Sequence, residues 1–281
     1  MLETVRRVEV MRTNLADARR ASDALAVEEP LEIRLDHTRE GEMVRTTLAV
    51  TMRTPGHDVE LAAGYLFTEG VVRDRKDIAR IGCCGPGRAT GPDNRIRVEL
   101  APHVVVEPGR LERHSYTSSS CGACGKTSIG ALRARRPWSL PRETPVVGGD
   151  LLRELPAVLR DAQSTFDATG GLHAAALFDV DGRLVVARED VGRHNAVDKV
   201  LGEQLLVGAL PAHERILIVS GRVSFELVEK ALMAGVPILA AIGAPSSLAV
   251  ETAREAGMTL VGFLSSERFN VYCGAHRTDL Q

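Results

Sequence analysis

Two hydrophobic periodicities divide the chain. In roughly the first hundred residues, alternating apolar positions and β-branched clusters predict short strands. These strands are Val5–Met11, Leu31–Leu35, Val44–Met52 and Arg95–Leu100. Between them, apolar residues at helical spacing predict one amphipathic helix over His57–Glu69, which begins near Pro55-Gly56 and ends at Gly70.

The last part of the chain alternates strands with helices. Leu172–Asp179 and Arg183–Ala187 flank Val180-Asp181-Gly182, which is a strong hairpin signal. A strand-helix-strand-helix-strand series then follows a first helix, and such a series implies a parallel sheet with right-handed crossovers. The predicted elements are helix Val191–Leu206, strand Ile216–Val219, helix Ser224–Ala234, strand Val236–Ile242, helix Ser247–Ala256, strand Met258–Leu264 and a final strand Phe269–Tyr272.

The carboxyl ends of these parallel strands share one edge of the sheet, where ligands bind in such folds. The segments that leave this edge are Ser220-Gly221-Arg222, Gly243–Ser247 and Phe263–Arg268. Two of them start helices whose free N–H groups favour anions, and Arg222 and Arg268 add positive charge. The edge is therefore a candidate anion site, although Gly, Pro and Ser are also ordinary turn residues between a strand and a helix.

Composition narrows the class of protein. The 281 residues are 44% hydrophobic and 26% charged, which is typical of a soluble globular protein with one large or two modest domains. The formal net charge of −2 gives no overall attraction to nucleic acid or to an anionic membrane, so any anion site must be local. No apolar stretch is long enough to span a membrane, and the N-terminus lacks the apolar region of a secretory signal. An odd number of cysteines, five, does not suggest a disulfide scaffold, so we expect a cytosolic protein with reduced thiols.

The stretch Thr117–Ser128 carries a C-x-x-C pair, Cys121 and Cys124, between glycines and after three serines. Such a pair has three possible uses. It forms half of a zinc site, it forms a redox disulfide, or one of its thiols carries sulfur. A glycine-rich tip suits a thiol that visits two partners in turn. Lys126 and a short helix predicted over about Thr127–Arg135 favour the reactive thiolate.

The other two uses of the pair have weaker support. A structural zinc ion needs four ligands, and the adjacent Cys83 and Cys84, or His114, would have to complete the set. Adjacent cysteines are poor ligands for one tetrahedral ion. A thioredoxin-type pair follows a strand, and no strand is predicted directly before Cys121. Cys83, Cys84 and Cys273 are most simply explained as structural.

Two polar segments remain. His173 opens a strand, but zinc deaminases place a Glu two residues after such a His and a P-C-x-x-C further on. Here Ala175 occupies that position and no P-C-x-x-C follows, so deaminase chemistry is disfavoured.

The segment Glu189–Lys199 gathers polar groups around a helix start, with His194 and Asp198 on one face. It is either a capped surface helix or a polar cluster that faces the ligand edge.

Several blocks of the sequence, in order, resemble the FdhD family, the formate dehydrogenase accessory sulfurtransferases. Cys121–Gly125 is similar to the C-G-x-C-G loop of that family. Further similar blocks span most of the chain, which makes the resemblance far more specific than a lone C-x-x-C. These blocks are Thr54–Gly70, Thr169–Ala176, Glu189–Lys199, Ser220–Glu226, and Gly257–Phe263 followed by Arg268–Tyr272.

The resemblance implies a role in making formate dehydrogenase active. Sulfur passes as a persulfide from a cysteine desulfurase to Cys121, with Cys124 as the assisting thiol. It is then delivered to a molybdenum cofactor, the bis(molybdopterin guanine dinucleotide) form. By motif match, the cofactor segment falls on Phe263, Leu264, Ser265, Ser266, Glu267 and Arg268. A pyrophosphate would not select Glu267, which instead meets a guanine N–H edge or faces water.

The resemblance also implies a cytoplasmic homodimer whose main domain has a cytidine-deaminase-like α/β fold. Together with the periodicities, it predicts a β-rich N-terminal region over 1–110, a basic connector with the C-x-x-C loop over 111–145, and the α/β domain over 146–281. No tightly held cofactor of its own is expected. Two other classes stay open, namely a zinc-stabilised binding module and a non-catalytic chaperone that only holds the cofactor.

Overall fold

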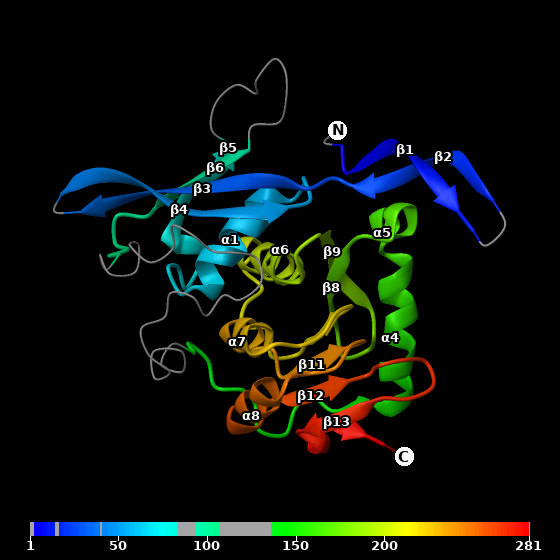
Figure 1. Ribbon diagram of the computed structural model, residues 1–281. Coiled ribbons are helices and arrows are strands. Elements are labelled where there is room, and N and C mark those ends of the chain that lie inside the picture. Colours follow the sequence, from blue (N-terminus) through cyan, green and yellow to red (C-terminus); the bar gives the residue numbers. More distant parts are fainter. Residues whose placement is uncertain (1–2, 15–16, 40, 84–93, 107–135, 281) are drawn as a thin grey trace.

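The computed structural model describes residues 3–14, 17–39, 41–83, 94–106 and 136–280. In this part of the chain the protein is a mixed α/β molecule, with two sheets on either side of a layer of helices (Figure 1). No helix among these residues has both the length and the apolar character needed to cross a membrane.

The N-terminal part consists of a hairpin and a four-stranded sheet with strand order β4-β3-β6-β5. On β3, Leu31, Ile33 and Leu35 are buried, and the residues between them face the other way. This alternation is the one predicted from the sequence, and the predicted strands are confirmed. The predicted strands are β1 (Val5–Thr13), β3 (Glu29–Arg39), β4 (Glu42–Arg53) and β6 (Arg95–Leu100). Two further strands, β2 (Ala18–Ala26) and β5 (Ile78–Cys83), were not predicted, and a 3-10 turn, η1 (Arg75–Asp77), precedes β5.

The predicted N-terminal helix is α1 (Asp58–Thr68), one residue shorter at each end than the prediction. Leu61, Leu66 and Phe67 are fully buried beneath the four-stranded sheet. Asp58 and Glu60 lie in its first turn, where acidic side chains complement the helix dipole.

The C-terminal part is built on a six-stranded sheet with strand order β13-β12-β11-β10-β8-β9. Strands β10, β11 and β12 are parallel, as predicted, whereas β8, β9 and β13 join the sheet in antiparallel pairs. The strands are β8 (His173–Phe178), β9 (Leu184–Asp190), β10 (Ile216–Val219), β11 (Ile238–Ala241), β12 (Thr259–Gly262) and β13 (Asn270–Cys273). The predicted hairpin and the predicted parallel series are therefore confirmed, with bounds that move by a few residues.

Helices cover both faces of this sheet. The predicted helices are α6 (Arg193–Leu206), α7 (Phe225–Met233) and α8 (Ser247–Glu255). Two helices and a short two-stranded sheet were not predicted. These elements are α4 (Gly149–Asp161), α5 (Ser164–Thr169), β7 (Val147–Gly148) and β14 (Thr278–Asp279), and a 3-10 turn, η2 (Ala275–Arg277), precedes β14.

The alternation of side chains along the parallel strands explains why the sheet is buried on both faces. Leu217 and Leu239 point into the larger core, which also contains Leu31 of the four-stranded sheet. Ile218 and Ala240 point the other way, into a smaller core with Leu155 of α4. Buried parallel strands are apolar on both faces for this reason, which fits the near-continuous apolar runs of β10 and β11.

The two parts of the protein meet where α1 crosses α6. A Cβ atom on Gly64 of α1 would lie 1.8 Å from the carbonyl oxygen of Asp198, and one on Gly202 of α6 would lie 1.9 Å from that of Glu60. Only glycine permits such close contact between the backbones. The four-stranded sheet and the six-stranded sheet consequently share one core.

Candidate functional site at the carboxyl edge of the C-terminal sheet

The segments that follow β10 and β11 lie against each other at the carboxyl ends of these strands. The Gly243 N–H donates to the Gly221 carbonyl oxygen at 3.1 Å, and Val223 and Pro245 form an isolated parallel bridge. A Cβ on Gly243 would lie 2.8 Å from the Gly221 oxygen, so glycine is needed for this approach. Beside the bridge is an open cavity of about 290 Å³, lined by Arg193, Arg222, Val223, Ser224, Ala244, Pro245 and Ser246.

The cavity combines positive charge with two helix starts. Helices α7 and α8 begin at its rim, after Ser224 and Ser246. The Ser246 hydroxyl caps α8 by accepting from the Ala249 N–H at 3.2 Å, whereas Ser224 makes no such cap. The Nε atom of Arg193 is buried and has no hydrogen-bond partner among the residues that the structure describes. An unpartnered buried guanidinium nitrogen is costly, and an anion in the cavity would offset that cost.

A pair of histidines lies behind the cavity. The Nε2 atom of His194 lies 2.9 Å from Oε2 of Glu226 and 3.3 Å from the Ser224 hydroxyl. Burial, with the nearby charges of Arg193 and His194, lowers the pKa of His173. His173 is therefore neutral at physiological pH and adds no positive charge to this edge.

The third predicted segment, Phe263–Arg268, reaches the same edge. The Phe263 N–H donates to the Gly243 carbonyl oxygen at 3.2 Å, and the Leu264 N–H donates to that of Ala241 at 2.9 Å. Phe263 has φ of 54°, a left-handed conformation that is strained for an aromatic residue, and its side chain is 44% exposed. The backbone thus holds this aromatic ring out toward solvent.

The rest of this segment forms a tight turn. The Ser265 hydroxyl accepts from the Arg268 N–H at 3.2 Å and donates to the Arg268 carbonyl oxygen at 3.0 Å. Leu264 is buried, whereas Ser266, Glu267 and Arg268 are exposed. The structure therefore brings the three predicted segments to one edge.

The predicted residues that follow β10 make different contacts. The Ser220 hydroxyl accepts a hydrogen bond from the Ala174 N–H at 2.8 Å and so ties β10 to β8. Gly221 packs over the ring of His173, and Arg222 lines the cavity. Arg193 and Ser224, which also line it, were not singled out as binding residues. The signal for Arg193 was its place in the polar segment Glu189–Lys199.

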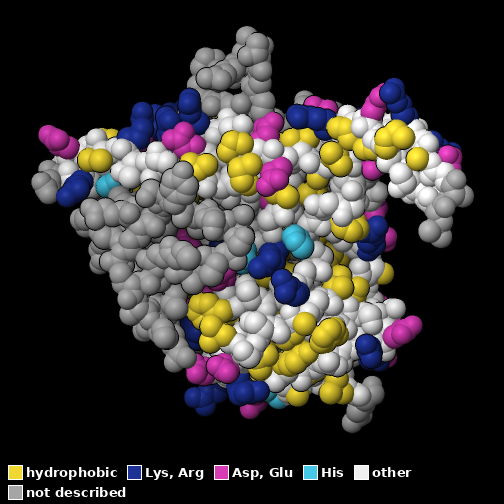
Figure 2. All heavy atoms as spheres, in the orientation of Figure 1, with side chains coloured by type: hydrophobic (Ala, Val, Ile, Leu, Met, Phe, Trp, Pro, Cys, Tyr) yellow, Lys and Arg dark blue, Asp and Glu magenta, His cyan; other side chains and the backbone are white. Residues whose placement is uncertain are grey.

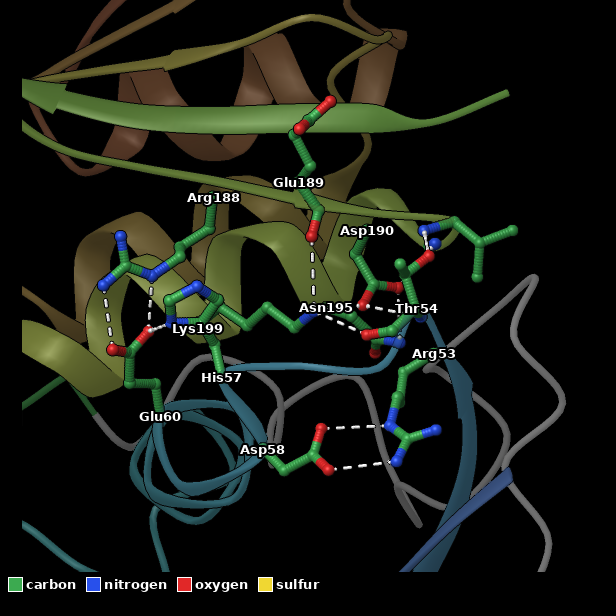
Figure 3. A network of polar contacts seen from close by, with 12 residues as sticks. Arg53, Thr54, His57, Asp58, Glu60, Arg188, Glu189, Asp190, Asn195 and Lys199 are labelled. Atoms are coloured by element: carbon green, nitrogen blue, oxygen red, sulfur yellow. Dashed lines mark hydrogen bonds and ion pairs between the residues drawn. The ribbon is translucent and has the colours of Figure 1, made fainter. Parts of the chain in front are cut away.

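That polar segment has two roles in the structure. Asp190 and Lys199 form a buried ion pair at 2.7 Å, and Lys199 also donates to the Thr54 carbonyl oxygen at 3.0 Å. Asn195 donates to the Met52 carbonyl oxygen at 2.8 Å and to Asp190 at 3.1 Å. Figure 3 shows this network between the end of β4 and the start of α6.

The hypothesis of a capped surface helix is wrong, because most of α6 is buried and no side-chain hydrogen bond caps it, whereas the hypothesis of a polar cluster at the edge of the sheet holds for Arg193 and His194. Asp190, Asn195 and Lys199 fasten the N-terminal part to α6, while Arg193 and His194 lie at the cavity. Gly192, and not Asp190, is the N-cap residue of α6. Asp190 nevertheless accepts from the Gly192 N–H at 2.8 Å.

The predicted sulfur-handling cysteines, Cys121 and Cys124, lie outside the described residues, as do Cys84, His114 and the predicted helix 127–135. Cys83 is exposed at the end of β5. Cys273 lies half-buried on β13, and burial raises the pKa of its thiol. Within the described ranges, no group of three or more His, Cys, Asp or Glu side chains is placed to hold a metal ion. The zinc hypothesis, which rests on the undescribed cysteines, stays a prediction.

The fold and the site define a mixed α/β protein with a cationic cavity at the edge of a parallel sheet. A family model described as the FdhD/NarQ family matches residues 26–279. Because this match covers most of the chain, the protein belongs to the FdhD/NarQ family.

Individual relatives agree with this assignment. The chain is 52% identical over 262 residues to a protein of Streptomyces avermitilis named sulfur carrier protein FdhD, with 92% of this chain and 90% of the relative covered. A protein of the same name from Nocardia farcinica is 51% identical over 276 residues, covering 98% and 94%. One from Mycobacterium tuberculosis is 49% identical over 260 residues, covering 91% of each chain.

A solved structure supports the fold. The crystal structure of a Desulfotalea psychrophila protein, assigned as a formate dehydrogenase accessory protein, aligns with a TM-score of 0.73. The alignment covers 99% of this chain and 100% of that one, at 24% sequence identity. The whole fold described here is thus shared with a protein of very different sequence.

Proposed function

We propose that this protein is the sulfur carrier that makes a formate dehydrogenase active. The observation that carries the proposal is the identity of about half of all residues, over nine-tenths of the chain, with proteins named sulfur carrier protein FdhD. The name assigned to the Desulfotalea psychrophila protein supplies the link to formate dehydrogenase.

The sulfur step of the proposal uses Cys121. Its thiolate attacks the outer sulfur of a persulfide on a cysteine desulfurase, the S–S bond of the donor breaks, and the donor cysteine leaves as a thiolate. Cys121 then carries the persulfide. Cys124 releases the sulfur by attacking the inner sulfur of Cys121, which forms a disulfide and expels the outer sulfur as hydrosulfide toward molybdenum. A cellular dithiol is needed to reduce that disulfide before the next cycle.

The substrate that receives the sulfur is, in this proposal, the molybdenum bis(molybdopterin guanine dinucleotide) cofactor. The residues at the carboxyl edge suit such a group. Arg193, Arg222 and the helix starts at Ser224 and Ser246 would hold phosphates. The exposed ring of Phe263 would stack on a guanine, and Glu267 would accept from its N–H edge.

The same proposal includes a cytoplasmic location, a homodimer and a cytidine-deaminase-like fold for the C-terminal part. An antiparallel hairpin, β8-β9, beside three parallel strands with intervening helices supports that fold. This fold is compatible with the absence of deaminase chemistry, because Ala175 occupies the position of the deaminase Glu.

Maturation of formate dehydrogenase in a host that lacks its own sulfur carrier of this family tests the proposal. Full-length protein should restore formate dehydrogenase activity, and Cys121→Ala should abolish it at equal protein level. Cys83→Ala, which changes the exposed cysteine at the end of β5, should retain it. Activity restored by a Cys121→Ala/Cys124→Ala variant would instead favour the chaperone that only holds the cofactor.

A further inference from the structure

The outer face of the four-stranded sheet carries an array of arginines that the sulfur chemistry does not use. The register of β4, β3, β6 and β5 places alternate side chains of these strands on the face opposite the core. Here this face is called the arginine face. Its charged residues are five arginines and three carboxylates, namely Arg34, Arg45, Arg80, Arg95, Arg97, Glu32, Asp36 and Glu99.

Two carboxylates of this face are each shared between two guanidinium groups. The carboxylate of Asp36 accepts from Nε of Arg45 at 2.8 Å and from Nε of Arg97 at 2.6 Å. The carboxylate of Glu32 accepts from Nε of Arg34 at 3.0 Å and from Nε of Arg95 at 3.2 Å. Each group of three therefore keeps one net positive charge, and its guanidinium groups are held in place.

The carboxylates stay ionised at neutral pH, so this charge count holds. Hydrogen bonding from Arg45 lowers the pKa of Asp36, and that from Arg34 lowers the pKa of Glu32. In the Asp36 group, the carboxylate lies beneath its arginines. The Asp36 side chain is 1% exposed, whereas those of Arg45 and Arg97 are 53% and 44% exposed. A molecule that approaches the face meets guanidinium groups first.

The array also has a hollow of its own. A groove of about 420 Å³ runs over β5 and β6, and its charged lining residues are four arginines and one carboxylate, namely Arg34, Arg45, Arg80, Arg97 and Glu99. Gly82 lies at its floor opposite Arg97, and a Cβ added to Gly82 would meet no atom within 4 Å. Figure 2 shows Lys and Arg side chains gathered along the upper edge of the molecule, over the strands labelled β3 and β6 in Figure 1.

We propose that the arginine face is a docking surface for an acidic, carboxylate-rich segment of a partner protein. Guanidinium groups recognise carboxylates through paired N–H donors, and an ordered array of them fits a run of Asp and Glu side chains. The face is positively charged, although the formal net charge of the molecule is −2, so it steers an acidic partner toward this surface. A symmetric dimer through this face would oppose two sets of arginines, and like-charge repulsion disfavours it.

Binding of a dye-labelled octaglutamate peptide to the full-length protein, followed by fluorescence anisotropy at low salt, tests the proposal. The wild-type protein should bind octaglutamate, should not bind octalysine with the same dye, and should lose affinity steeply as salt is added. Arg80→Glu should weaken binding at least fivefold. Arg20→Glu, which makes the same charge change on the exposed face of β2, should alter it less than twofold.

A second variant distinguishes peptide binding in the groove from nonspecific electrostatic attraction to the face. Gly82→Phe leaves the charge unchanged and fills open space, so it should weaken octaglutamate binding at least threefold while the protein stays folded by circular dichroism. Equal effects of Arg80→Glu and Arg20→Glu, or no effect of Gly82→Phe, would overturn the proposal. Displacement of the peptide by low millimolar inorganic phosphate would also overturn it, because the face would then be a site for small anions.

Discussion

The guanidinium group of Arg188, on β9, faces the carboxylate of Glu60, on α1, with N–O distances of 2.5 and 2.8 Å (Figure 3). The two side chains are each 18% exposed and come from opposite parts of the protein. This ion pair therefore fastens the helix beneath the four-stranded sheet to the sheet that carries the candidate site.

Stability should depend on the ionisation of Glu60. Burial by itself would raise its pKa, but hydrogen bonds from Arg188 and His57 outweigh burial and lower the pKa of Glu60 from the usual 4.5 to about 2. A carboxylate with a lowered pKa stabilises the fold above its unfolded pKa, and this stabilisation is lost as the pH falls from 4.5 toward 2.

Arg188→Met should consequently cost on the order of 2–3 kcal/mol of unfolding free energy at pH 7. The difference from wild type should stay constant down to about pH 5 and shrink below pH 4.5. Urea denaturation at a series of pH values measures it. Arg160→Met, which removes an exposed partner of Asp167, is the matched control and should cost well under about 1 kcal/mol. A pH-independent difference would show that Arg188 acts through packing alone.

Another buried ion pair joins α6 and α7. The ammonium group of Lys230 lies 2.7 and 2.8 Å from the two carboxylate oxygens of Asp198, and the Thr68 hydroxyl donates to the same carboxylate at 2.8 Å. Lys230→Met leaves Asp198 as a buried charge without its cation, which typically costs about 3–5 kcal/mol. Arg183→Met, at an exposed pair with Asp181, should cost about 0.5 kcal/mol or less. Similar losses of unfolding free energy from both variants in chemical denaturation would contradict this prediction.

The contact between α1 and α6 should tolerate no side chain at Gly64. Gly64→Ala would drive a Cβ into the backbone of Asp198, and neither helix can move without disturbing the shared core. We expect a loss of about 3 kcal/mol or more, or failure to fold, since overpacking a core is costly. Gly82→Ala, which meets open space, is the control. A thermal midpoint of Gly64→Ala within a few degrees of wild type would show that the helices separate easily.

The proposed stacking of a guanine on Phe263 gives a binding prediction. Phe263→Ala should weaken binding of GDP by roughly 5- to 100-fold, the range expected for the loss of one stacked aromatic ring. Arg222→Gln should weaken GDP but not guanosine, because it removes a phosphate contact only. Val207→Ala, at an exposed apolar residue on another surface, should leave both affinities unchanged. Isothermal titration calorimetry with GDP and guanosine distinguishes these cases, and equal GDP affinity in all variants would place the nucleotide elsewhere.

Much of the fold follows from local pattern. The period-two alternation of β3 and the helical spacing of α1 each reflect one buried face, which the sequence displays directly. Helix α4 escaped prediction although Leu152, Leu155 and Leu159 recur along it, and Pro156 inside the helix is the kind of residue that marks a break.

The site was predictable to the extent that it depends on chain direction. The three segments at the carboxyl edge follow from parallel strands alone. The role of Lys199 was not predictable, because its partners include the Thr54 carbonyl oxygen, 145 positions away, which only tertiary packing brings to it. A buried lysine on an apolar helix face has no local signature, and neither has the buried Nε of Arg193.

Intact-mass spectrometry tests the central claim, that this protein carries sulfur on Cys121. The full-length protein is incubated with a cysteine desulfurase and cysteine, beside Cys121→Ala, Cys124→Ala and Cys83→Ala variants. We predict a mass gain of one sulfur atom that is reversed by a thiol reductant, kept in Cys83→Ala and Cys124→Ala, and lost in Cys121→Ala. No gain in the wild-type protein, or a gain that persists in Cys121→Ala, would contradict the carrier assignment.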